Sequence, residues 1–156
     1  MRTTSFPVLL LLATAAACGE DEPGIDAEAC EHLQEGPYTS VTASAVRDDT
    51  APRVAADHMA YTVALAAGAV TYVAFPAAEA ADYVVYLDKP VPFQVLDTAG
   101  AMVTLEASET SSPGCAAIRG KHTFPLPVGT AYFGLGPSMG MPVNLVVEEA
   151  GDHDEH

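Results

Sequence analysis

The sequence predicts an all-β fold, an antiparallel β-sandwich or jelly roll of about eight strands. Two observations support this prediction. From Tyr38 onward, apolar residues alternate with polar or small residues at a period of two, which is typical of strands with one buried face. The alternating stretches are short, and Gly, Pro and Asp separate them at nearly regular spacing. We therefore expect one β-sandwich domain over residues 30–148.

The expected strands follow one another closely along this domain. Ala66-Ala67-Gly68 is expected to turn the chain into a return strand, and Asp97 to Gly100 to form a hairpin turn. Pro92 has no backbone donor, which favours an edge position for its strand. In chain order, the alternating stretches are Val41–Ala45, Met59–Leu65, Val70–Phe75, Tyr83–Leu87, Val91–Val95, Met102–Leu105, His122–Leu126, Ala131–Leu135 and Val143–Val147.

An export signal is expected before the domain, over residues 1–17. Arg2 is followed by an apolar run from Phe6 to Ala17 that ends in three alanines directly before Cys18. This run has 12 residues, whereas a transmembrane helix needs about 20. Cleavage before Cys18 is therefore expected.

The end of this signal resembles the lipobox of bacterial lipoproteins, in which the chain is cut before a Cys that then receives lipid. That family usually has Leu three positions before the Cys, where this chain has Ala15. The resemblance implies a lipid anchor on Cys18, and Gly19 in place of Asp implies the outer membrane. Secretion without lipid is the alternative, because Ala15-Ala16-Ala17 also satisfies a standard signal peptidase.

The segments beside the domain are expected to have little structure. Residues 18–29 are acidic, contain Pro and Gly, and read as a lipidated flexible tether. Residues 149–156 read as a disordered acidic tail that contains histidine. Within Ala27–Gln34, one or two helical turns are expected to end at Gly36-Pro37.

The charge of the chain limits the class of its partners. The formal net charge is −15, from 21 acidic and six basic residues. Seven acids lie between Glu20 and Glu35 and five between Glu148 and Glu155, with no Lys or Arg among them. Such a surface repels nucleic acid, because binding to phosphates requires Lys and Arg. Cations are the expected partners, either metal ions, basic proteins of the envelope or polycationic glycans, and the alternative is that the acids serve solubility alone.

Three cysteines are present, Cys18, Cys30 and Cys115. If Cys18 carries lipid, the other two remain in an oxidising compartment, and we expect a Cys30–Cys115 disulfide. The alternative is a pair of free thiols that bind metal, although no Cys-x-x-Cys spacing supports it.

The predicted sandwich resembles bacterial pre-peptidase C-terminal-type domains. In that family, a turn of the form Gly-Thr-x-Tyr precedes a late strand, and Gly129-Thr130-Ala131-Tyr132 stands in that place here. The match covers roughly residues 60–147. It implies a non-catalytic accessory or binding module.

The five histidines are the main candidate ligands. His32, His58 and His122 each lie beside a polar or charged neighbour, and a Cys30–Cys115 disulfide is expected to bring His32 and His122 into one neighbourhood. Three convergent imidazoles would suit Zn²⁺ or Cu²⁺. His153 and His156 alternate with carboxylates in the tail and form a second candidate site. The alternative is that these are unrelated surface histidines.

We therefore expect a non-enzymatic, membrane-anchored envelope module that binds Zn²⁺ or Cu²⁺. No nucleophile elbow, phosphate loop, His-Glu-x-x-His motif or dinucleotide fingerprint occurs in the sequence. The main alternative is a metal-free interaction module with an exposed aromatic patch from Tyr38, Tyr86 and Tyr132. A hydrolase would need a nucleophile and a base within hydrogen-bond reach in a cleft.

Overall fold

The computed structural model describes residues 24–150 and confirms the all-β, sandwich-like prediction. One helix precedes ten strands. The elements are α1 (Ile25–Glu35), β1 (Tyr38–Thr42), β2 (Ala60–Ala64), β3 (Thr71–Ala77), β4 (Ala81–Leu87), β5 (Phe93–Leu96), β6 (Met102–Val103), β7 (Ala107–Glu109), β8 (Gly120–Leu126), β9 (Gly129–Leu135) and β10 (Val143–Glu149).

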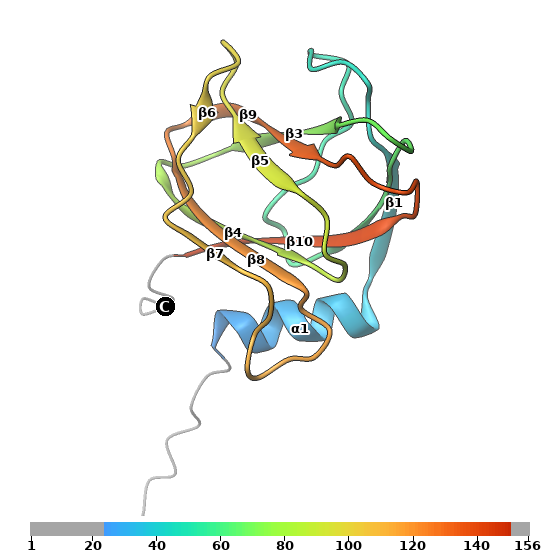
Figure 1. Ribbon diagram of the computed structural model, residues 1–156. Helices are drawn as coiled ribbons and strands as arrows, with labels where there is room; N and C mark the ends of the chain where they lie inside the picture. The colour runs from blue at the N-terminus through green and yellow to red at the C-terminus, as the bar shows by residue number, and fades with distance from the viewer. Residues whose placement is uncertain (1–23, 151–156) are drawn as a thin grey trace, which may run out of the picture.

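The strands form two sheets that face each other, and α1 covers the outer face of the larger sheet (Figure 1). The six-stranded sheet has the order β1-β2-β10-β4-β8-β7, and the four-stranded sheet has the order β3-β9-β5-β6. The main core lies between the sheets, where Phe75, Phe124 and Phe133 pack together with aliphatic residues from both layers. The period-two pattern arises because each strand directs alternate side chains into this core.

The topology departs from the sequence prediction in three places. β2 and β3 belong to different sheets, so Ala66-Ala67-Gly68 joins the two layers and does not close a hairpin. β5 lies between β9 and β6 and is not an edge strand. This position is possible because Pro92 stands just before the strand and removes no ladder hydrogen bond. β1 pairs with β2 in parallel, whereas a fully antiparallel arrangement was expected. The hairpin turn at Asp97 to Gly100 is confirmed by the pairing of β5 with β6.

The parallel pairing of β1 and β2 has a structural cost, because parallel neighbours need a long crossover connection. Residues 43–59 form this connection. They run along the other sheet, where Ser44 bridges to Tyr72 and Arg53 to Ala74 on β3. The connection buries Val54 and then returns to start β2, with His58 near its end.

α1 is longer than the one or two turns expected, and it starts inside the predicted tether. Residues 25–29 therefore belong to the folded unit. Ala29 and Leu33 are buried against a second apolar cluster on the outer face of the larger sheet, which includes Tyr86 and Val146. The helix ends at Gly36, whose φ of +78° suits a residue without a Cβ.

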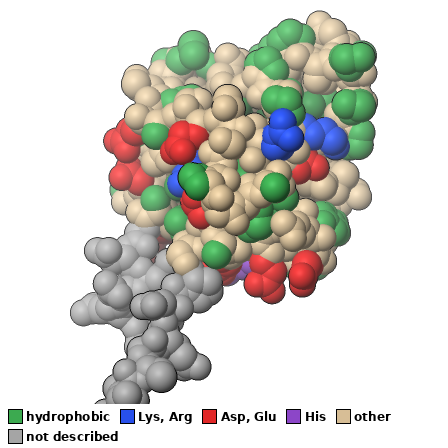
Figure 2. All heavy atoms as spheres, turned by 60° about the horizontal axis from the view of Figure 1, so that its bottom comes forward, with side chains coloured by type: hydrophobic (Ala, Val, Ile, Leu, Met, Phe, Trp, Pro, Cys, Tyr) green, Lys and Arg blue, Asp and Glu red, His purple; other side chains and the backbone are tan. Residues whose placement is uncertain are grey.

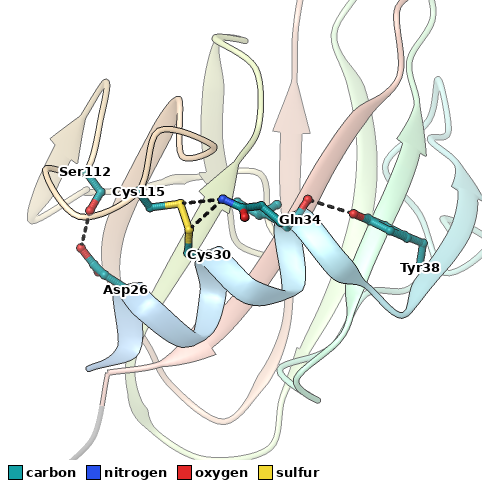
Figure 3. Close-up of a disulfide and its surroundings, with 7 residues drawn as sticks. Asp26, Cys30, Gln34, Tyr38, Ser112 and Cys115 are labelled. Carbon is teal, nitrogen blue, oxygen red and sulfur yellow. Dashed lines mark hydrogen bonds between the residues drawn. A yellow bond between two sulfur atoms is a disulfide. The ribbon is translucent and has the colours of Figure 1, made fainter. Parts of the chain in front are cut away.

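The predicted disulfide between Cys30 and Cys115 is present and joins α1 to the loop between β7 and β8 (Figure 3). Gln34 lies one turn further along α1, with its amide nitrogen 3.3 Å from Cys30 Sγ. The phenol of Tyr38, just after the helix, donates to the Leu33 carbonyl. These bonds fix both halves of α1 relative to the sheet. Within residues 24–150, no helix has the length and apolar composition that a membrane crossing requires.

Replacing both disulfide cysteines by alanine is expected to lower the free energy of unfolding by about 2–4 kcal/mol, because the bond closes a long loop in the unfolded chain. Urea unfolding of the oxidised protein and of the Cys30→Ala/Cys115→Ala variant measures this difference. Adding a reductant should destabilise the wild type and leave the variant unchanged. Equal midpoints for the two oxidised proteins would contradict the prediction.

Candidate metal centre

Glu28 and His32 lie one turn apart on α1, so their side chains share one face of the helix. The spacing follows from the helical period, and Ala29 and Leu33 fix which face is buried. Glu28 is about one-third exposed and His32 about one-sixth. Both side chains are therefore partly accessible to solvent where α1 borders the sheet.

His58 reaches this border from the end of the connection between β1 and β2. It has a φ of 55°, in the left-handed region where a non-glycine residue is uncommon. Its neighbour Asp57 accepts a hydrogen bond of 2.8 Å from the Tyr61 phenol. Burial and the nearby Asp57 raise the pKa of Tyr61 to about 12, so this hydroxyl remains a donor at neutral pH. The bond fixes the backbone beside His58.

The ligand atoms of Glu28, His32 and His58 all lie within 4.8 Å of one another. His58 Nδ1 is 2.8 Å from Glu28 Oε1, and His32 Nε2 is 3.9 Å from the same oxygen. The two imidazole rings have centroids 6.2 Å apart. Three groups that bind transition metals therefore converge, drawn from α1 and from a segment more than twenty residues away in sequence.

His32 is oriented by its other ring nitrogen. Nδ1 lies 3.4 Å from the Gly36 carbonyl oxygen at the end of α1, while Nε2 faces Glu28. Histidines that bind metal usually donate their second ring N–H to a carbonyl or carboxylate, which fixes the tautomer and the ring direction. The geometry of His32 fits that arrangement.

A fourth group, Glu148, approaches from β10. Its Oε2 is 3.3 Å from His58 Nδ1, and its side chain is 2% exposed. Glu148 points to the outer face of the sheet, as Val146 does, because alternate residues of β10 share a face. Two carboxylates thus converge on one imidazole nitrogen, one of them buried and one partly exposed.

His122 is not part of this cluster. On β8 it pairs with Val85 of β4, whose side chain lies in the main core, so His122 faces the inside of the sandwich. Its ring stacks on Phe93 at 4.7 Å, and Nδ1 is 2.9 Å from the Ser108 hydroxyl. Burial lowers the pKa of His122 and favours the neutral ring. The disulfide attaches the β7–β8 loop to α1 on the outer face, but β8 directs His122 to the opposite face.

The Ser108–His122 pair meets only part of the requirement for a hydrolase. The imidazole borders a shallow pocket of about 250 Å³ beside Pro90 and Arg119. Among the described residues, no carboxylate contacts the His122 ring, so the group that orients the base in a catalytic triad is absent there. The hydrogen bond between Ser108 and His122 gives the partly buried imidazole a polar partner, which is a structural role.

Several predicted residues lie outside the described part of the chain. These are Cys18, His153 and His156, together with the export signal and residues 18–23 of the tether. The expected aromatic patch is not formed, because Tyr86 and Tyr132 are buried and only Tyr38 is exposed.

The site also includes two residues that the sequence analysis did not propose, Glu28 and Glu148. Glu28 could have been found from its i, i+4 spacing to His32 once a helix was assigned. The sequence signal for Glu148 is weaker. Glu148 is an acid that follows the apolar residues of β10, and the alternating pattern assigns it to the face that points away from the core. Neither signal shows that the two carboxylates meet.

The N-terminal end of α1 is held by Asp26. Its carboxylate accepts hydrogen bonds from the Tyr86 phenol and the Ser112 hydroxyl, and pairs with Lys121 Nζ at 2.8 Å. Burial by itself would raise the pKa of Asp26, but the bonds from Lys121, Tyr86 and Ser112 outweigh it and lower the pKa below 3.8. The ionised carboxylate is thus the form that attaches α1 to the sheet.

Comparison with known proteins gives no family assignment. No protein-family model matches the chain, and no curated protein matches its sequence at a significant level. The resemblances to lipoproteins and to pre-peptidase C-terminal-type domains therefore remain expectations.

Asp26→Asn is expected to lower the free energy of unfolding by about 2 kcal/mol at neutral pH, because hydrogen bonds to a charged acceptor are lost. A lowered pKa stabilises the fold above the ordinary pKa of 3.8, and this contribution disappears as pH falls through the lower folded value. Denaturation from pH 7 to pH 2 should therefore show the wild type and the variant converging in acid. Asp49→Asn is the control, since that exposed carboxylate makes no hydrogen bond or ion pair among residues 24–150. A stability difference that persists unchanged in acid would contradict the prediction.

Proposed function

We propose that this chain is a lipid-anchored protein of the bacterial cell envelope that binds a divalent transition-metal ion, Zn²⁺ or Cu²⁺, without catalysing a reaction. The observation that carries the metal proposal is the convergence of Glu28, His32 and His58 within 4.8 Å. Imidazole and carboxylate are both ligands of Zn²⁺, and imidazole suits Cu²⁺ as well.

The distances in the cluster agree with the size of such a site. In tetrahedral Zn²⁺ coordination, ligand atoms about 2.0–2.1 Å from the metal lie about 3.3 Å from each other. The observed separations of 2.8 Å and 3.9 Å bracket that value. A side-chain rotation that brings His32 Nε2 closer to Glu28 Oε1 would move the ligand atoms toward that spacing.

The electrostatic setting also favours a cation. The chain carries a formal net charge of −15. Acidic side chains occur in several places on the surface shown in Figure 2, and those at its lower edge lie beside histidine. A negative surface raises the local concentration of cations and repels anionic partners. His58 is 54% exposed, which leaves the cluster open for an ion to enter.

Titration of Zn²⁺ and Cu²⁺ into the untagged protein, followed by isothermal calorimetry, is expected to show binding at micromolar metal. His32→Ala and His58→Ala should each weaken it by at least about 100-fold, because removal of a ligand costs more than removal of a supporting group.

His122→Ala is the matched control, since that imidazole lies on the other face of the sheet, and it should bind as the wild type does. His153→Ala/His156→Ala reports the separate contribution of the tail. Absence of heat at micromolar metal, or binding that survives loss of His32 and His58, would overturn the metal proposal.

A metal-free interaction module is the second candidate, and one observation favours it. His58 Nδ1 contacts both Glu28 and Glu148, so these contacts alone would connect α1, the β1–β2 connection and β10. On this hypothesis, the cluster stabilises the fold and the function lies in another surface. The same titration separates the two hypotheses.

The anchor proposal depends on Cys18. Cys18→Ser is expected to move the protein from the membrane fraction to the soluble fraction, because the acyl chains that hold it can no longer be attached. Fractionation of cells that express either form, with immunodetection of the protein, measures the shift. Cys30→Ser/Cys115→Ser is the control, since it removes the two disulfide-bonded cysteines without touching the lipidation site. Equal membrane retention of the Cys18→Ser form would contradict lipidation.

A further inference from the structure

We propose that Glu148 is the fourth protein ligand, so that a tetrahedral divalent ion such as Zn²⁺ is enclosed by Glu28, His32, His58 and Glu148. This inference rests on the proposed metal-binding function and deepens it. A metal with four protein ligands has no open position, which is the arrangement of structural and retained metal sites. The ion would therefore be held in place, with no position left to activate a water molecule.

The first argument is geometric. His58 Nδ1 and Glu148 Oε2 are 3.3 Å apart, the separation expected for two ligand atoms of one tetrahedral Zn²⁺ ion. The same nitrogen is 2.8 Å from Glu28 Oε1. Both carboxylates therefore point at the one ligand atom that the connection between β1 and β2 contributes.

The second argument concerns charge and burial. Glu148 is almost completely buried, and its Oε2 lies 3.3 Å from His58 Nδ1. Glu28 brings a second negative charge to the same nitrogen. A divalent cation between the two carboxylates would balance both charges.

The third argument is that the four residues belong to three separate elements. Glu28 and His32 lie on α1, His58 ends the connection that crosses the other sheet, and Glu148 lies on β10 at the centre of the larger sheet. Glu148 is held by strand pairing, because it lies opposite Val84 of β4 in the larger sheet. An ion held by all four would tie the helix and the irregular connection to this strand.

Co²⁺ substituted for Zn²⁺ tests the inference in the wild-type protein, because Co²⁺ absorbs visible light much more strongly in tetrahedral than in octahedral sites. We expect an intense visible spectrum that does not change when azide is added, since azide needs an open coordination position. A spectrum that shifts with azide would overturn the four-ligand site.

Glu148→Gln supplies the second test, because it keeps the shape of the side chain and removes its charge. Co²⁺ and Zn²⁺ affinity should fall at least about tenfold, and the spectrum should become sensitive to azide. Glu149→Gln is the matched control, one residue along and directed to the opposite face of β10, and it should leave both readouts unchanged. Circular dichroism checks that each variant is folded.

The outcomes separate this inference from the proposed function. If the wild type binds neither Co²⁺ nor Zn²⁺, both fail. If the wild type binds metal but Glu148→Gln binds equally well with the same spectrum, the four-ligand site fails and the three-ligand proposal stands. If Glu148→Gln does not fold, the azide response of the wild type decides the question.

Discussion

The packing of α1 against the outer face of the six-stranded sheet is the interaction on which the rest of this structure depends. That face presents Val84, Tyr86 and Val146, which would otherwise be exposed to water. Ala29 and Leu33 cover them, so the helix removes an apolar surface that a two-layer sandwich leaves open. The Cys30–Cys115 disulfide and the Asp26 carboxylate then fix the position of the helix along the sheet.

A second constraint comes from the parallel pairing of β1 with β2. Because parallel neighbours cannot be joined by a tight turn, the chain must cross the other sheet before it returns. The return brings the end of that connection beside α1, in a left-handed conformation at His58. Backbone conformations of this kind occur often at functional sites, where the surrounding structure compensates for the strain. Tyr61 contributes to that compensation through its bond to Asp57.

The two acidic ends of the folded domain meet at the candidate metal centre. Glu28 belongs to the first acidic stretch and Glu148 begins the last one, and both contact His58. In sequence, these stretches look like solvated ends that keep the protein soluble. In the fold, β10 is a central strand and α1 lies across it, so part of the negative charge is concentrated at one site and partly buried.

The sequence by itself determined the all-β class, most of the strands and the disulfide, because a period of two, turn residues and the two cysteines within the folded part of the chain are local or compositional signals. The alternating stretch His122–Leu126 is confirmed as part of β8, and its register with β4 places His122, Phe124 and Leu126 on one face. The tertiary structure alone decided which histidines meet. His32 and His58 converge and His122 does not, because sheet order and the face of each strand follow from long-range pairing that no short stretch of sequence encodes.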